Sequence, residues 1–226
     1  MSPLRAFRQR LIRHYRTHHL SRSGVSVLSD DCWAGRIYAE LGTPCRSPFV
    51  RMGFTPPEYL KFILHMREPD ALKVLSVSSE ERGYPIIETR HARLFGMHHD
   101  SNESFVQAFE RRRRRIDWDK LLIKIDFGKA KYRPCDIEQW NAMKLPRAVA
   151  FYPDQPEYRA LSIHRGVAVK NWSNDGGRMF NLSCRHFDLF TWLQHGEVSF
   201  SRRRLIAQYL MFTHSILPPW LSSQSS

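Results

Sequence analysis

The stretch GVSVLSDDCWAGRIYAEL occupies residues 24–41 and joins a strand signal directly to a helix signal. Residues 24–29 place β-branched and apolar side chains after a glycine turn, which is typical of a short buried strand. Asp30 and Asp31 follow at once and are favourable helix caps, so the sequence predicts a helix from Trp33 to the end of the stretch. A strand that leads straight into a helix is the basic unit of α/β folds.

The rest of the chain repeats this alternation. Strands are predicted at residues 72–77, 84–88, 92–97, 121–127, 148–152 and 161–169. Helices are predicted at residues 56–66, 102–116, 137–143, 187–193 and 202–212. We therefore expect an α/β fold with a single domain, in which a mixed or mostly parallel sheet is flanked by helices and preceded by a basic amphipathic N-terminal helix.

The expected organisation has three parts. These are a basic amphipathic N-terminal segment at residues 1–22, an α/β domain at residues 23–200, and a C-terminal helix with a frayed tail at residues 201–226. The four cysteines form no C-x-x-C pair and are expected to be reduced. No run approaches the roughly 20 apolar residues of a membrane span, and no signal peptide is predicted.

The first 22 residues carry six arginines and no acidic residue, with apolar side chains at helical spacing. Three interpretations of this helix stay open. It can lie in the headgroup layer of an anionic membrane, or it can pack its apolar stripe on its own domain. It can also be a mitochondrial targeting peptide, because such peptides are rich in arginine and poor in acidic residues.

The charge balance points to an anionic partner. Thirty-five lysines and arginines face 22 acidic residues, which gives a net charge of +13. This balance favours a phosphate-bearing substrate, an anionic membrane surface or nucleic acid. Nucleic acid is the less favoured partner, because no established nucleic-acid-binding signature is present. The chain also lacks a P-loop, a G-x-G-x-x-G fingerprint and a G-x-S-x-G elbow, which argues against the enzyme classes that depend on them.

Asp30, Asp31, Cys32 and Trp33 stand where the first strand gives way to its helix. In open α/β sheets, ligands bind beyond the carboxyl ends of the strands, often facing a helix N-terminus. The two aspartates are therefore candidate catalytic groups, and the thiol and indole are candidate ligand contacts. The plainer interpretation is a capped helix with a buried tryptophan. No metal ligands and no particular cofactor are predicted.

Three further features are candidates for the same site. His98 follows a predicted strand and can act as an acid or base near neutral pH. Five consecutive arginines cannot share one helix face, so Arg111 and Arg115 are the candidates for holding phosphate. An exposed, charged helix end is the alternative. Trp172 lies in a polar loop where it can stack on a sugar ring, although a plain turn fits the loop equally well.

Several short motifs follow one another in an order that resembles a known family. They are DDCWAGRIY at residues 30–38, SPFV at 47–50, PPEYL at 56–60, MHH at 97–99, FERR at 109–112 and RIDWDKLL at 115–122. The chain resembles, over roughly residues 25–195, a bacterial family whose members are usually labelled exopolysaccharide biosynthesis proteins. Asparagine is usual in that family where Asp30 and Asp31 stand here.

The resemblance implies a role in the assembly of capsule, exopolysaccharide or lipopolysaccharide. We expect a sugar-modifying or glycosyl transferase, or an acyl transferase, that acts on an anionic or phosphate-bearing sugar. The expected location is the cytoplasm, with peripheral association at the inner membrane. A nucleic-acid-binding module and a non-catalytic scaffold of polysaccharide assembly are the alternatives.

Overall fold

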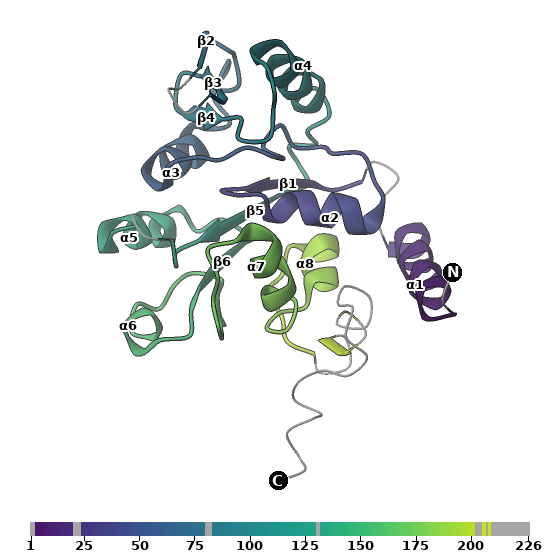
Figure 1. Ribbon diagram of the computed structural model, residues 1–226. Coiled ribbons are helices and arrows are strands. Elements are labelled where there is room, and N and C mark those ends of the chain that lie inside the picture. Colours follow the sequence, from purple (N-terminus) through teal and green to yellow (C-terminus); the bar gives the residue numbers. More distant parts are fainter. Residues whose placement is uncertain are drawn as a thin grey trace.

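The computed structural model describes residues 3–19, 24–79, 83–129 and 132–201, together with residues 205, 206 and 208. Its centre is a four-stranded parallel sheet with the strand order β1-β5-β6-β7 (Figure 1). These strands are β1 (Ser26–Ser29), β5 (Leu121–Asp126), β6 (Ala148–Pro153) and β7 (Gly166–Val169). Because all four run in one direction, their carboxyl ends meet at a single edge of the sheet.

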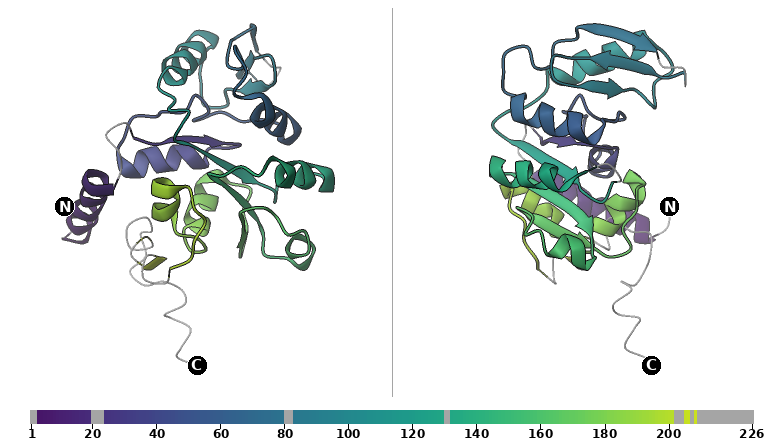
Figure 2. Two further views of the ribbon diagram at one scale, coloured as in Figure 1. Left: turned by 180° about the vertical axis from the view of Figure 1, so that it is seen from behind. Right: turned by 90° about the vertical axis from the view of Figure 1, so that its left-hand side faces the viewer.

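Helices cover both faces of this sheet (Figures 1 and 2). The helices are α1 (Pro3–His19), α2 (Trp33–Leu41), α3 (Pro56–His65), α4 (Asn102–Arg113), α5 (Pro134–Met143), α6 (Pro156–Arg159), α7 (Gly176–Ser183) and α8 (Leu189–His195). Val27 and Leu122 belong to the core under α2, α7 and α8, whereas Leu28 and Ile123 belong to the core under α3 and α5. Neighbouring residues of one strand therefore serve opposite cores, as in parallel sheets buried on both sides.

A smaller antiparallel sheet lies beside α4, away from the parallel sheet (Figure 2). It has the order β2-β3-β4 and consists of β2 (Ser76–Ser79), β3 (Pro85–Glu88) and β4 (Arg93–Phe95). Phe105 and Phe109 of α4 are fully buried and join this sheet to the core beneath α3. An isolated bridge between Gly53 and Phe95 ties the sheet to the loop before α3.

Helix α1 packs on its own domain. Ile12 is buried in the core beneath α2, and Arg8 forms an ion pair of 2.5 Å with Glu40 of α2. Phe7, in contrast, is 55% exposed. Among the described residues, no helix is both long enough and apolar enough to cross a membrane.

The α/β fold and its parallel sheet confirm the prediction from sequence, and three local differences have physical causes. The predicted strand at residues 161–169 begins only at Gly166, because Ser162 and Arg165 have left-handed backbone angles that interrupt an extended chain. The strand predicted at residues 72–77 begins at Ser76, after a turn that buries Leu72. The glycines of the Trp172 loop open α7, whose N-terminus is capped by Asp175. Most of the predicted helix at residues 202–212 lies outside the described residues.

Candidate functional site

A buried ion network lies at the carboxyl edge of the parallel sheet. Pairing of β1 with β5 sets Ser29 opposite Lys124, so the aspartates that follow β1 lie beside the end of β5. Lys124 Nζ contacts Asp30 Oδ1 at 2.9 Å and Asp31 Oδ2 at 2.8 Å. Lys129 Nζ contacts the same two carboxylates at 2.8 and 3.1 Å. The two aspartates that the sequence offered as catalytic groups are therefore held by two lysines.

These contacts keep Asp31 and Lys124 charged. Although burial raises the pKa of Asp31, the adjacent charges of Lys124 and Lys129 outweigh it and hold that pKa well below its usual range. Burial lowers the pKa of Lys124, but Asp30 and Asp31 more than compensate, so its pKa is raised overall. Removing one partner of such a buried ion pair is strongly destabilising, because the other charge stays buried and uncompensated. Asp31 therefore stays ionised, and the carboxylates of both Asp30 and Asp31 are engaged by the two lysines.

Asp126, the last residue of β5, differs from the other two carboxylates. Its Oδ1 accepts hydrogen bonds from Trp172 Nε1 at 2.7 Å and from the backbone N–H of Gly128 at 3.0 Å. Its Oδ2 is buried and has no hydrogen-bond donor within the described part of the chain; Lys124 Nζ is 4.0 Å away. Burial raises the pKa of Asp126 to about 6, against the opposing effect of the lysines.

Trp172 closes this edge of the sheet. Its indole is half-buried against the core and lies so close over Gly128 that a Cβ at that position would be 2.3 Å from the ring. The hydrogen bond to Asp126 fixes the ring orientation. The structure thus gives Trp172 a sealing role, in place of the exposed sugar platform that the sequence offered.

Trp33 lies in the middle of the core. It has no exposed surface, its indole N–H donates to Ser183 Oγ at 3.0 Å, and the rings of Phe151, Phe180 and Trp192 surround it. This burial corrects the expectation that the indole contacts a ligand. The plainer interpretation from sequence, a buried tryptophan at the start of a helix, describes the observed geometry.

Cys32 and His98 come together across 66 residues of sequence. Cys32 Sγ lies 3.4 Å from His98 Nε2, where the loop after β4 meets the start of α2. Asp31 Oδ1 accepts the backbone N–H of Trp33 at 2.9 Å and so fixes the turn that presents Cys32. Burial and the nearby charge of Asp31 raise the pKa of the Cys32 thiol. The pair is therefore a protonated thiol next to an imidazole at neutral pH.

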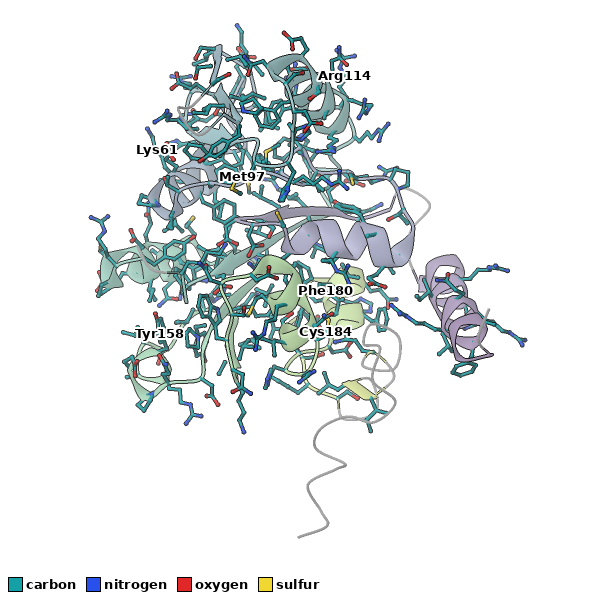
Figure 3. All side chains as sticks on the ribbon, viewed as in Figure 1. Lys61, Met97, Arg114, Tyr158, Phe180 and Cys184 are labelled. Carbon is teal, nitrogen blue, oxygen red and sulfur yellow. The ribbon has the colours of Figure 1, made fainter. Side chains whose placement is uncertain are left out.

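This pair lies in a cleft of about 810 Å³ between α2, the loop before α3 and the loop after β4. Met97, one of its lining residues, lies between the two sheets in Figure 3. Three arginines line the cleft: Arg36 of α2, Arg51 of the loop and Arg112 of α4. Of the acidic side chains described, only Asp100 belongs to the lining. The cleft is therefore basic, with two thiols and two imidazoles in its wall.

Helix α4 supplies a different arginine from those that the sequence singled out. Arg111 and Arg115 are exposed, and neither is among the described residues of the cleft wall. Arg112 instead lines the cleft and donates to the carbonyl of Val50 at 2.7 Å. Since five residues turn through about 500°, only part of the run can face inward. The buried residues of α4 fix the orientation of the helix, and this orientation decides which arginines face inward.

Arg51 has a left-handed backbone conformation, with φ of 64°. Such a conformation costs a non-glycine residue on the order of 1 kcal/mol and is common at functional sites. Arg51 follows Val50, whose carbonyl binds Arg112, so the strained backbone brings two guanidinium groups to one wall. Nothing in local sequence spacing predicted this, because Arg51 and Arg112 meet only through the tertiary fold.

A D-x-D triplet, Asp117-Trp118-Asp119, precedes β5 and so lies at the opposite, amino-terminal edge of the sheet. There the backbone N–H of Asp117 donates to Ser26 Oγ at 2.9 Å, and its carboxylate lies 3.6 Å from Lys120 Nζ. The triplet is therefore separated from the cleft residues at the start of α2. Sequence analysis missed Lys124, Lys129 and Asp126 of the ion network. It also missed Arg36, Arg51 and Arg112 of the cleft wall.

The comparison with known families covers most of the chain. The profile of the domain of unknown function DUF1919 matches residues 4–194, and the chain therefore belongs to this family. It is also similar to a protein of Haemophilus influenzae named "Uncharacterized protein". The two are 22% identical over 188 residues, which cover 78% of this chain and 87% of that relative. Neither match names polysaccharide assembly.

Proposed function

We propose that this member of the DUF1919 family acts in the assembly of bacterial surface polysaccharide, as a transferase for a phosphate-bearing sugar. The observation that carries the proposal is the basic cleft, in which three arginines from three separate elements face a thiol–imidazole pair. The link to polysaccharide rests on the resemblance of the sequence to exopolysaccharide biosynthesis proteins. The cleft supports the phosphate-bearing class of substrate.

Arg51 and Arg112 bind the phosphate in this proposal. Guanidinium groups form forked, charge-assisted hydrogen bonds with phosphate oxygens, and two of them on one wall match a diphosphate or sugar phosphate. Arg36 is partly engaged, because it forms an ion pair of 2.9 Å with Glu40. Burial lowers the pKa of Arg112 but leaves it far above neutrality, so its charge is retained.

His98 moves the proton in the transfer step. In the transfer step a sugar hydroxyl forms a bond to the donor sugar while the bond from that sugar to its phosphate leaving group breaks, and the hydroxyl gives its proton to an imidazole at the cleft wall. Cys32 Sγ can accept a hydrogen bond from His98 Nε2–H and thereby orient the ring, which leaves Nδ1 as the nitrogen that accepts the proton. The roles of Asp30 and Asp31 are then to hold the turn in place.

Helix α1 supplies the contact with the inner membrane. Phe7 is largely exposed, and Arg10 and Arg13 are exposed on the same helix. Each basic residue near an anionic surface contributes about 1 kcal/mol, and an apolar side chain adds to it by entering the headgroup layer. This location would bring the cleft to the cytoplasmic face, where lipid-linked sugars are extended.

The test is a binding measurement on the purified full-length protein with nucleotide sugars and a short-chain polyprenyl phosphate. At least one ligand should bind, and Arg51→Ala or Arg112→Ala should weaken it by roughly 10-fold or more, as expected when a charged hydrogen bond is lost. Arg111→Ala is the matched control, because it removes an exposed arginine of the same helix outside the cleft wall. Equal affinities in all three variants would refute the phosphate site.

His98→Ala separates catalysis from binding. With the ligand found above, it should retain affinity and melting temperature but lose transfer to an acceptor. Binding without any turnover in the parent protein would favour the scaffold. Tight, salt-dependent binding of DNA or RNA that Arg51→Ala leaves unchanged would favour the nucleic-acid-binding module.

A further inference from the structure

A second group of chemically active side chains lies apart from the cleft. His65 is the last residue of α3, Glu68 follows in the turn after that helix, and His91 lies in the tight connection between β3 and β4. The backbone N–H of Glu68 donates to the carbonyl of His65 at 2.9 Å, and the connection is closed by hydrogen bonds between Thr89 and Ala92. The fold thus brings together residues that lie up to 26 positions apart in the sequence. The hydrogen bonds above hold the backbone that carries them.

The donor atoms of these residues converge. His65 Nδ1 lies 2.6 Å from one oxygen of Glu68, and His91 Nε2 lies 2.9 Å from the other. The two imidazole rings stack, with centroids 4.5 Å apart and planes inclined by 12°. One nitrogen from each ring and a carboxylate oxygen all lie within 4.8 Å of one another. Both rings therefore turn a nitrogen toward the same anionic group.

Two imidazoles and one carboxylate form a typical zinc donor set. Zn²⁺ binds nitrogen and oxygen ligands at about 2.0–2.2 Å, so ligand atoms in a tetrahedral site lie about 3.3 Å apart. The observed nitrogen–oxygen separations of 2.6 and 2.9 Å must widen slightly, and the larger separations, which are at most 4.8 Å, must shorten; small side-chain rotations achieve both. A ring nitrogen that now faces Glu68 becomes a ligand when the ring proton moves to its other nitrogen.

We propose that His65, Glu68 and His91 bind a Zn²⁺-class divalent cation, with a fourth coordination position open to solvent. The side chains of His65 and Glu68 are 34% and 39% exposed, whereas that of His91 is 9% exposed, so the group is anchored on one side and accessible on the other. Three protein ligands with an open position are the arrangement of catalytic zinc sites. None of the three residues lines the basic cleft.

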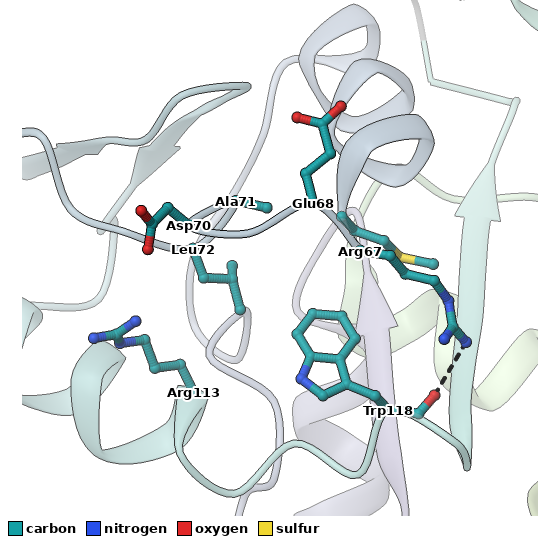
Figure 4. Close-up of a pocket in the computed structure, with 8 residues that line it drawn as sticks. Arg67, Glu68, Asp70, Ala71, Leu72, Arg113 and Trp118 are labelled. Carbon is teal, nitrogen blue, oxygen red and sulfur yellow. Dashed lines mark hydrogen bonds between the residues drawn. The ribbon is translucent and has the colours of Figure 1, made fainter.

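The site is also distinct from a hollow of about 350 Å³ next to it. That hollow lies between the turn after α3, Arg113 and Trp118, and Arg67 crosses it to donate to the carbonyl of Trp118 at 3.3 Å (Figure 4). Glu68 contributes to its rim, but its carboxylate points away from Arg113 and Trp118 in Figure 4. The carboxylate is thus directed toward the two histidines and not toward the arginines.

The test is calorimetric titration of the full-length, chelator-treated and reduced protein with ZnCl₂, followed by Co²⁺ absorption spectroscopy. We expect one strong site per chain, and a Co²⁺ spectrum without the near-ultraviolet band of thiolate ligation. Glu68→Gln and His65→Asn should each weaken binding by more than the roughly 10–100-fold that loss of an outer-shell partner costs. We choose His65 and not His91 for replacement, because His91 is buried and a variant there can fail to fold. His65 is partly exposed, so its replacement should leave the fold intact.

Two control variants locate the ion. His195→Asn removes an exposed imidazole at the end of α8 and should leave the affinity unchanged. Cys32→Ser removes the thiol of the cleft and should also leave it unchanged. The proposal is overturned if the parent protein shows no strong site, if binding survives in both Glu68→Gln and His65→Asn, or if Cys32→Ser abolishes it.

Discussion

Replacing Asp126 with asparagine should change how the stability of the protein depends on pH. Burial raises the pKa of Asp126 to about 6 from an ordinary value of 3.8. At 1.36 kcal/mol per pH unit, this difference corresponds to about 3 kcal/mol. The group lies wholly inside the protein, so solvent does not screen this free energy away.

The sign follows from which state holds the proton more tightly. The folded protein binds the Asp126 proton more strongly than the unfolded chain does, so this group favours folding fully below about pH 3.8. That contribution is lost as the pH rises through about 6. Asparagine preserves the oxygen that accepts from Trp172 and Gly128 but does not titrate. Relative to the parent, the free energy of unfolding of Asp126→Asn should rise by about 2.5 kcal/mol between pH 4 and pH 7.5, because at pH 4 the carboxyl of the unfolded chain is already partly ionised.

Urea unfolding followed by circular dichroism at several pH values measures this difference directly. Other titrating groups are shared by the two proteins and cancel in the comparison. Asp119→Asn is the control, because it removes an exposed carboxylate and should leave the difference nearly flat. If the difference between Asp126→Asn and the parent is also flat, burial does not raise the pKa of Asp126 in the folded protein.

Three further variants test the fold and its surface. Lys124→Met removes the fully buried one of the two lysines that pair with Asp30 and Asp31, and should cost about 3–5 kcal/mol in urea unfolding at pH 7. A loss below about 1 kcal/mol would contradict the ion network. Gly128→Ala places a methyl group against the Trp172 ring and should cost about 1–3 kcal/mol, seen as a lower melting temperature, whereas an unchanged value would mean the ring moves freely. Phe7→Ser should weaken flotation on anionic vesicles by roughly 10-fold without changing stability, because its ring is exposed. Failure of the parent protein to float would remove the membrane role.

The parts of the fold that sequence analysis predicted are those that local patterns determine. Asp30 and Asp31 after a β-branched run marked the start of α2, and Asn102 with Glu103 marked the start of α4. Residues 161–165 were misjudged because an apolar run predicts a strand, although two of its residues adopt left-handed angles. The helix α7 was missed because Asn174-Asp175-Gly176-Gly177 is also turn chemistry.

The site was harder to predict because its residues meet through the tertiary fold. Lys124 sits inside an apolar strand, where a lysine is ordinarily expected to face solvent, and only pairing of β5 with β1 brings it to two aspartates. Arg112 was not singled out among the five arginines, because the spacing of the run alone does not show which of them turns toward the cleft. His65 and His91 lie on elements that no local pattern joins.

The buried ion network supports one wall of the cleft, because Asp31 connects the lysines to the turn that carries Cys32. Its Oδ2 is held by Lys124 at 2.8 Å, while its Oδ1 accepts the backbone N–H of Trp33 and so fixes the first turn of α2. That turn carries Cys32, whose thiol meets His98 at 3.4 Å. Loss of the lysine therefore releases the carboxylate that orients the turn, and the thiol–imidazole contact loosens with it. An acid–base group on a loop needs such support, since displacement by about 1 Å can cost 100-fold in rate. Polar groups buried at the end of a parallel sheet are costly unless they are paired, and here the pairing also holds the turn that carries part of the cleft wall.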